Sequence, residues 1–233
     1  MIHFVLKLIY KFDRKFFKSY GYYIYDRILS LFHRENVDFD ARCNAYAAVR
    51  NLTKNSIVID GGANVGDETA VFAKRAGTVY AFEPSPACYK ELCKRFQATS
   101  NVHLYPCALS DRDTEATYYF NHRFTRWNPT LYSKTGGLYD IINVKDLSSR
   151  VKCIDLCAFI ESLNAQVDLV KLDIEGMEYA VLNKLIETGI YKKCNTILVE
   201  THSKMLPQFT EADSALRALI KERSITNIDL TWD

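Results

Sequence analysis

The sequence predicts an α/β fold built on a doubly wound, mostly parallel sheet. Short apolar runs rich in β-branched residues alternate with segments of helical periodicity through most of the chain. The first such run ends in an acid and a loop with three glycines, and a helical segment follows directly. This alternation implies parallel strands joined by right-handed crossovers. The length of 233 residues suffices for one such domain with some decoration.

The expected elements follow one another from residue 55 onward. Strands are expected at 56–60, 78–82, 102–107, 151–156, 167–172, 196–200 and 226–231, with an exposed strand at 115–120. Helices are expected at 67–75, 86–96, 157–163, 177–188 and 211–222. Ser85 is the expected N-cap of one helix, with Pro86 at its first position. One domain over 55–233 is therefore predicted, with a loop-rich insertion at 121–150 that is typical of a functional segment.

Residues 1–54 are expected to form a helical N-terminal extension that packs on the core or caps it. Ten aromatic residues lie between Phe4 and Phe32. Residues 1–34 also hold seven basic and two acidic side chains, a net charge of +5 that leaves −3 for the rest of a chain at +2. A basic amphipathic arm of this kind also suits peripheral contact with a membrane surface or an acidic partner. Nucleic-acid binding by the arm is the least favoured reading.

The cysteine pattern favours a reduced, cytoplasmic protein. The chain has seven cysteines, an odd number, without a CxxC pair or a secretory signal. No apolar run approaches the ~18–20 residues of a membrane span. The expected location is therefore cytoplasmic, with the inner membrane face as the alternative if residues 1–34 bind lipid. A homodimer is left open.

The first loop and the end of the second strand predict a nucleotide-type cofactor site. The loop comprises Asp60, Gly61, Gly62, Ala63, Asn64 and Gly66, and no GxGxxG register fits it. Glycines allow positive φ and close approach of the backbone to a ligand. Glu83 ends the second strand, where an acid accepts hydrogen bonds from ribose hydroxyls. Ala108, Leu109 and Ser110 follow the third strand on the same edge, where they would offer backbone groups and an apolar wall to an adenine.

Acidic side chains are expected to gather where the later strands end. Lys171 and Asp173 share one face of a central strand, because strand side chains alternate. A buried lysine needs a partner, and Asp173 and Glu200 are the two candidates. We expect Asp173, Glu175, Glu178, Glu200 and His202 to converge at one rim of the sheet, over the cofactor.

Four motifs resemble the FkbM family of class I S-adenosylmethionine-dependent methyltransferases. They lie between about residues 55 and 202, in the family's order and at fitting spacings. They are Val58-Ile59-Asp60-Gly61-Gly62-Ala63-Asn64-Val65-Gly66, Ala81-Phe82-Glu83-Pro84, Ala108-Leu109-Ser110-Asp111 and Val170-Lys171-Leu172-Asp173-Ile174-Glu175-Gly176-Met177-Glu178. The segment Val151-Lys152-Cys153-Ile154-Asp155-Leu156 resembles a further family block. The resemblance implies a Rossmann-like fold. Such folds usually close with two strands after the last helix, whereas this chain has room for one.

The resemblance also implies roles for individual residues. The loop from Asp60 to Gly66 would hold the methionine part of the cofactor, and residues 108–110 the adenine. Glu83 would take the ribose, with Pro84 and Ser85 beside it. Asp173 would lie nearest the sulfonium and its methyl group.

The predicted activity is methyl transfer to a hydroxyl, as family members often methylate sugars or glycan-like natural products. Such a hydroxyl needs a base or a cation, because it is a poor nucleophile at neutral pH. Asp173, Glu175 and His202 are the candidate bases, in a catalytic set that also includes Lys171 and Glu200. A divalent metal held by Asp173, Glu175 and Glu200 is the alternative. Arg126, Trp127 and Tyr132 of the insertion combine hydrogen-bond donors with flat rings that suit a sugar.

Two other functions use the same features. A nicotinamide-dependent oxidoreductase would need the glycine loop and the ribose acid, but the missing GxGxxG register argues against it. An RNA 2′-O-methyltransferase would use a Lys-Asp-Lys-Glu tetrad, of which Asp173 and Glu200 are a partial match. A net charge of +2 gives little attraction to a phosphate backbone, so a small-molecule or glycan acceptor is favoured over nucleic acid.

Overall fold

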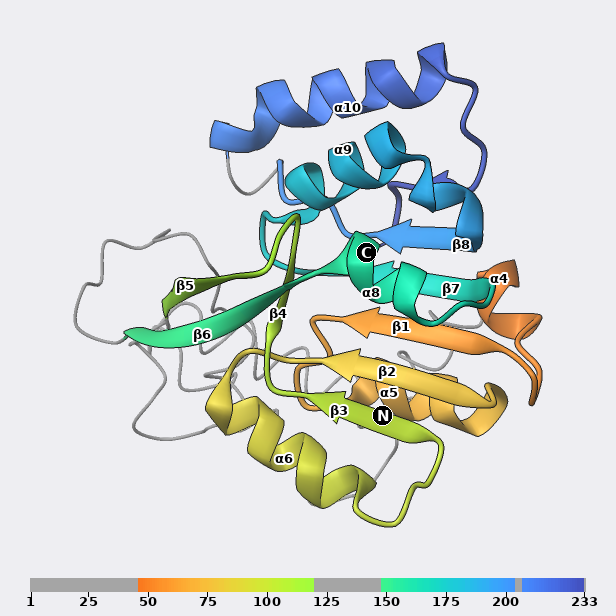
Figure 1. Cartoon of the computed structure of the whole chain (residues 1–233), viewed down its shortest axis with the longest axis vertical. Coiled ribbons are helices and arrows are strands. Elements are labelled where there is room, and N and C mark those ends of the chain that lie inside the picture. Colours follow the sequence, from red (N-terminus) through yellow and green to blue (C-terminus); the bar gives the residue numbers. More distant parts are fainter. Residues whose placement is uncertain (1–45, 120–147, 204–206, 233) are drawn as a thin grey trace, which may run out of the picture. The chain divides into compact units, whose positions relative to one another are not determined.

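The computed structural model of the chain describes residues 46–119, 148–203 and 207–232 (Figure 1). The predicted N-terminal arm at 1–34 lies outside the described residues. So do the predicted acceptor contacts at Arg126, Trp127 and Tyr132. Their roles therefore stay predictions.

A sheet of six parallel strands forms the centre of the fold. Its order is β3 (Val102–Tyr105), β2 (Thr78–Phe82), β1 (Ile57–Gly61), β7 (Val167–Leu172), β8 (Cys194–Val199) and β9 (Ile228–Asp229). The chain runs outward from β1 to β3 and then returns to place β7 on the other side of β1. In sheets of this kind, ligands bind where the strand order reverses, outside the carboxyl ends of the strands. The predicted doubly wound α/β fold is confirmed.

Helices connect the strands and cover both faces of the sheet. They are α4 (Ala47–Arg50), α5 (Asp67–Arg75), α6 (Pro86–Phe96), α8 (Leu156–Ser162), α9 (Glu178–Thr188) and α10 (Thr210–Glu222), with short 3-10 segments η2 (Ile190–Lys193) and η3 (Pro207–Phe209). In Figure 1, α8 lies in front of the sheet and α5 behind it. Tyr46, just before α4, donates its hydroxyl to the Thr231 carbonyl (3.0 Å) and packs on Trp232, with ring centroids 4.5 Å apart.

A second, three-stranded sheet lies on the side toward which the arrowheads of β1, β2 and β8 point (Figure 1). It consists of β4 (Ala108–Ser110), β6 (Ser148–Asp155) and β5 (Thr114–Tyr119), in that order. The strands expected at 115–120 and 151–156 correspond to β5 and β6, but their pairing into a separate sheet with β4 was not predicted. The expectation of one strand over 102–107 is corrected. The chain leaves the large sheet after Tyr105 and makes a turn in which the Cys107 N–H donates to the Tyr105 carbonyl (2.9 Å). Residues Ala108–Ser110 then pair with β6 in the small sheet.

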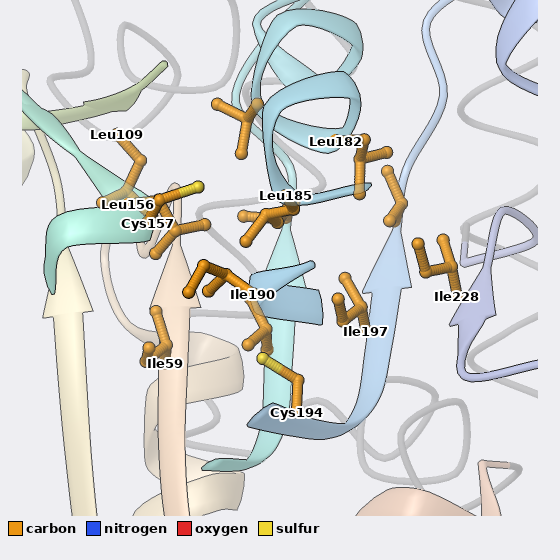
Figure 2. Close-up of a cluster of buried hydrophobic side chains, with 14 of the residues drawn as sticks. Ile59, Leu109, Leu156, Cys157, Leu182, Leu185, Ile190, Cys194, Ile197 and Ile228 are labelled. Atoms are coloured by element: carbon orange, nitrogen blue, oxygen red, sulfur yellow. The ribbon is translucent and has the colours of Figure 1, made fainter. Parts of the chain in front are cut away.

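Apolar side chains bury one face of the large sheet beneath α8 and α9. Figure 2 shows Ile59 and Ile197 from the strands in one cluster with Leu182 and Leu185 of α9. All four are fully buried. Alternation along β1 therefore sends Ile59 into this core and Asp60 to the opposite face.

The small sheet is tied to the main body by Asp155 at the end of β6. Its Oδ1 accepts hydrogen bonds from the N–H groups of Cys157 (2.9 Å) and Ala158 (3.4 Å), which caps α8. Its Oδ2 lies 2.6 Å from Nζ of Lys184 on α9. Asp155 therefore joins β6, α8 and α9 at one point.

Six cysteines of the described part are free thiols, and Cys93 alone among them is exposed. In the same part of the chain, no helix is both long and apolar enough to cross a membrane. The cytoplasmic location, the membrane contact and the homodimer stay predictions.

Candidate active site

Asp60 and Lys171 are brought together by the pairing of β1 with β7. Their Cα atoms are partners in the parallel register, so both side chains emerge on the same face. Asp60 is fully buried, and its Oδ2 accepts a hydrogen bond from the Thr69 hydroxyl (2.6 Å). Its Oδ1 lies 3.5 Å from the Lys171 ammonium. The Asp60 carboxylate thus contacts the protein's own groups beneath the loop.

Lys171 supports the glycine loop from below. Its Nζ lies 2.7 Å from Oε2 of Glu68 and donates hydrogen bonds to the carbonyls of Gly62 (3.0 Å) and Gly61 (3.3 Å). Burial alone would lower the pKa of Lys171, but the charges of Glu68 and Asp60 raise it above its ordinary value. The ammonium is therefore charged and saturated with protein partners.

Of the two partners predicted for Lys171, Asp173 is confirmed and Glu200 is not. Asp173 Oδ2 lies 3.7 Å from Nζ, although Glu68 of α5, which the sequence did not indicate, makes the closest ion pair. Glu200 forms no ion pair with Lys171 in the structure. Placement of Lys171 beneath the loop, 1% exposed, favours a positioning role over contact with a substrate.

The glycines let the loop pack against its neighbours. Gly62 has φ 77°, and a Cβ there would lie 1.8 Å from the Asp173 carbonyl oxygen. Gly66 has φ 88°, and a Cβ there would lie 2.4 Å from the Phe96 ring. Both conformations suit glycine, as expected. The loop approaches the residue after β7 at Gly62 and helix α6 at Gly66. Packing within the protein therefore explains both glycines without a ligand.

Glu83 follows β2 and closes the other side of the loop. Its Oε2 accepts a hydrogen bond from the Asn64 N–H (2.8 Å) and its Oε1 accepts one from the Ser85 N–H (2.7 Å). The side chain is 95% buried, and burial raises its pKa to about 7 against these two hydrogen bonds. Each oxygen keeps a lone pair for a further donor.

Ser85 occupies the N-cap position of α6, with Pro86 at the first helical position, as predicted. Its hydroxyl makes no capping hydrogen bond, however, and its backbone N–H donates to Glu83. The Ser85 Oγ is buried and has no hydrogen-bond partner within the described residues. A polar group next to Glu83 would satisfy it.

The predicted adenine segment lies beside the loop, although in the small sheet. Ala108, Leu109 and Ser110 are all buried. Leu109 is close enough to Gly61 that a Cβ on that glycine would lie 2.8 Å from its Cδ1. The segment thus forms an apolar wall next to the glycine loop.

The carboxyl ends of β7 and β8 bring together several of the predicted catalytic residues. His202 is 2% exposed, and its Nε2 lies 3.6 Å from Asp173 Oδ1 and 3.5 Å from Glu175 Oε2. Its Nδ1 lies 3.3 Å from Oε1 of Glu178. Glu200 follows β8, with its N–H on the Leu172 carbonyl (2.9 Å). The predicted rim of acids around one histidine is therefore present.

Glu178 has a role in this rim that the sequence did not assign to it. The fully buried carboxylate accepts hydrogen bonds from the N–H groups of Ile174 and Gly176, both at 2.7 Å. These bonds close the turn in which Glu175 (φ 55°) and Gly176 (φ 104°) have positive φ. A non-glycine residue at positive φ is strained, and such strain collects at functional sites. The only sequence feature that could have indicated this role is the spacing, with a glutamate four residues after Ile174.

Burial and neighbouring charges shift the pKa values of three groups in the rim. Burial raises the pKa of Glu175 to about 8 and that of Glu200 to about 7, and the charge of Asp173 adds to both shifts. Burial would lower the pKa of His202, but Glu178, Glu175 and Asp173 reverse this and raise it to about 9. Groups with pKa values near neutrality can exchange protons with a bound substrate.

Fold and site together define a Rossmann-like α/β domain with an acidic rim beside the glycine loop. The family model for the methyltransferase FkbM domain matches residues 60–224. The chain therefore belongs to the FkbM methyltransferase family, and the predicted recognition is confirmed.

Individual relatives are more distant. The methyltransferase sdnD of Sordaria araneosa is 26% identical over 180 residues, which cover 66% of this chain and 69% of that protein. The methyltransferase FkbM structure from Methylobacillus flagellatus KT aligns with a TM-score of 0.47 at 13% identity; the match covers 73% of this chain and only 38% of that one. SMU.1697c from Streptococcus mutans, solved in complex with SAH, has a TM-score of 0.25 and 27% identity, with 26% and 36% of the two chains covered. These likenesses carry no conclusion about the acceptor.

Proposed function

We propose that the domain binds S-adenosylmethionine at the carboxyl ends of β1 and β2 and transfers its methyl group to a hydroxyl of a sugar, glycan or glycan-like acceptor. The observation that carries the proposal is Glu83, a buried carboxylate whose two oxygens are held against the glycine loop by Asn64 and Ser85. Membership of a methyltransferase family supplies the reaction class.

The residues present fit this cofactor. A ribose has two neighbouring hydroxyls, and the remaining lone pairs of Glu83 can accept hydrogen bonds from both. The buried Ser85 Oγ, which lacks a partner within the described part, can bond the same sugar. Leu109 and Ala108 supply the apolar wall that an adenine needs.

The cofactor would supply a methyl group activated by a positively charged sulfur. The chain's own residues would orient the acceptor hydroxyl and hold its proton. Two features support this role for Asp173: it directly follows β7, and its backbone contacts the loop at Gly62. Its side chain is 30% exposed, so an acceptor can reach it.

His202 and Glu175 would orient the acceptor hydroxyl while Asp173 takes its proton. His202 lies beside both carboxylates. The raised pKa values of His202 and Glu175, about 9 and about 8, keep both groups mainly protonated at neutral pH, which suits hydrogen-bond donation to the acceptor. Glu178 would act as a positioning residue, since it is buried behind Nδ1 of His202.

The placement of Lys171 argues against the RNA 2′-O-methyltransferase alternative. A lysine in a Lys-Asp-Lys-Glu tetrad has to face the substrate, whereas Lys171 is 1% exposed and paired with Glu68. Family membership likewise favours methyl transfer over hydride transfer with a nicotinamide.

An acceptor panel tests the proposal. The purified chain would be incubated with methyl-labelled S-adenosylmethionine and, in parallel, with oligosaccharides, nucleotide sugars, RNA and matched DNA. We expect label on a carbohydrate, resistant to mild base as a methyl ether is. A base-labile methyl ester, or label that enters RNA but not DNA of the same sequence, would contradict the acceptor class.

A further inference from the structure

We propose that Asp173, Glu178 and His202 form a binding site for one divalent transition-metal ion of the Mn²⁺ or Zn²⁺ type. Each residue offers a ligand atom, and the three atoms lie within 4.8 Å of one another. Ligands bound to a single Zn²⁺ ion at about 2.0–2.2 Å lie no farther apart than about 4.4 Å. The three atoms are close to this limit, so a small shift of one side chain would let all three bind the same ion.

The second observation is the state of His202. Its side chain is 3% exposed, and its Nδ1 has no hydrogen-bond partner within the described residues. The nitrogen lies 3.3 Å from Glu178 Oε1, without the alignment of a hydrogen bond. Buried polar nitrogens normally have a partner, so the exception asks for one. A metal ion among these carboxylates would satisfy the imidazole.

Glu178 is preorganised as a ligand. Two backbone N–H groups, of Ile174 and Gly176, hold its oxygens at 2.7 Å and leave each with a free lone pair. Partners of this kind fix the orientation of metal ligands in known sites. The carboxylate would therefore not have to reorganise when an ion binds.

Charge and access agree with this assignment. Three carboxylates, those of Asp173, Glu175 and Glu178, lie within 4 Å of the His202 ring nitrogens. The Lys171 ammonium lies 3.7 Å from Asp173 Oδ2 but makes its closest ion pair, at 2.7 Å, with Glu68. Side chains of Asp173 and Glu175 are 30% exposed, which leaves an entry path for an ion.

The donor set indicates the class of metal. Mg²⁺ and Ca²⁺ prefer sites made only of oxygen ligands, whereas one imidazole with two carboxylates suits Mn²⁺, Zn²⁺ or Co²⁺. The set also differs from the one expected from the sequence, since Glu178 and His202 replace Glu175 and Glu200. A bound ion would lower the pKa of an acceptor hydroxyl. That role rests on the proposed function; binding of the ion does not.

The experiment measures metal binding in the absence of cofactor and acceptor. Protein stripped with EDTA and then freed of it would be titrated with MnCl₂, with calorimetry and the electron paramagnetic resonance signal of free Mn²⁺ as readouts. We expect one saturable site per chain and weaker binding of Mg²⁺. Glu178→Gln and His202→Phe should each weaken Mn²⁺ binding by at least about tenfold. Glu115→Gln, which removes an exposed carboxylate of the small sheet, should not change it.

Absence of saturable Mn²⁺ binding by the folded wild-type chain would overturn the proposal. Unchanged binding by His202→Phe would also overturn it, with circular dichroism showing that the variant is folded. That variant decides the question if Glu178→Gln fails to fold. A separate titration with S-adenosylmethionine in EDTA keeps the two proposals apart. Loss of cofactor binding with intact Mn²⁺ binding contradicts the proposed function alone, and the reverse result contradicts the metal site alone.

Discussion

The backbone of Gly62 packs directly against that of Asp173: a Cβ on Gly62 would lie 1.8 Å from the Asp173 carbonyl oxygen. The Asp173 N–H in turn donates a hydrogen bond to the Gly61 carbonyl (3.1 Å). The glycine loop and the first residue of the acidic rim are thus a single packed unit. Any change that separates them should affect cofactor binding and the rim together.

Gly62→Ala should therefore abolish binding of S-adenosylmethionine and destabilise the domain. Gly189→Ala is the matched control, because Gly189 has φ 76° against 77° for Gly62 but nothing within 4 Å of an added Cβ. Both variants carry the strain of positive φ, about 1 kcal/mol, and Gly62→Ala adds a clash with backbone. Urea unfolding and cofactor calorimetry would compare them. Equal losses in the two variants would show that the contact with Asp173 is unimportant.

Lys171→Met should lower the free energy of unfolding by about 3–5 kcal/mol, because it removes the buried cation that pairs with Asp60 and Glu68. The double variant Lys171→Met/Glu68→Gln should lose less than the sum of the single changes. A denaturation cycle over the four proteins measures this coupling. If Lys171→Met kept its stability and lost only turnover, the lysine would be catalytic, as the sequence suggested.

Cofactor affinity should rise with pH through about 7, the pKa of Glu83, because the ionised carboxylate accepts both ribose hydroxyls. Well below that pH, affinity should fall by about tenfold per unit. Calorimetry between pH 5.5 and 8.5 would record the profile. In Glu83→Gln, binding should be weak and this dependence absent. The same pH profile in both proteins would remove Glu83 from the cofactor site.

Glu83 should also make the stability of the cofactor-free protein fall as the pH rises, opposite to the rise in cofactor affinity. The pKa of Glu83 is about 7 in the folded protein and 4.5 in its ordinary state, so between these values the folded state binds more protons than the unfolded state. Its contribution to stability is then lost as the pH rises from 4.5 to 7. Thermal unfolding without cofactor should show this decline in the wild type and a flatter profile in Glu83→Gln. A wild-type stability that rises through this window by the same amount as the variant's would contradict the assignment.

Asp155→Ala should cost about 1–2 kcal/mol, because it removes the cap of α8 and the ion pair with Lys184. Glu115→Ala is the control in the same small sheet. Its partner Arg150 and Glu115 itself are 69% and 66% exposed, so the change should cost no more than about 0.5 kcal/mol. Urea unfolding of both variants checks the difference. A loss of similar size in both would mean that Asp155 does not join the small sheet to the body.

The parts of the site that the sequence predicted depend on local order along the chain. A strand, a glycine loop and a helix define the position of the loop, and an acid at the next strand end defines Glu83. Strand alternation placed Lys171 and Asp173 on one face, because that periodicity is independent of tertiary structure. The acidic rim followed from the rule that parallel strands end at one edge.

The missed features depend on tertiary contacts. Glu68 follows the loop on α5, and its ion pair with Lys171 of β7 depends on tertiary packing. Residues 108–110 form a strand too short to be recognised, and they pair with β6, far along the chain. Glu178 was placed in the rim, but its two backbone hydrogen bonds arise from the unusual turn at Glu175 and Gly176.

Binding of S-adenosylmethionine beside Glu83 can be measured by calorimetric titration, with nicotinamide adenine dinucleotide and Glu83→Gln as comparisons. The proposed cofactor site predicts binding of one S-adenosylmethionine per chain, no binding of the dinucleotide, and a large loss of affinity in the variant. Binding of the dinucleotide in place of S-adenosylmethionine, or equal affinity of Glu83→Gln and the wild type, would contradict it.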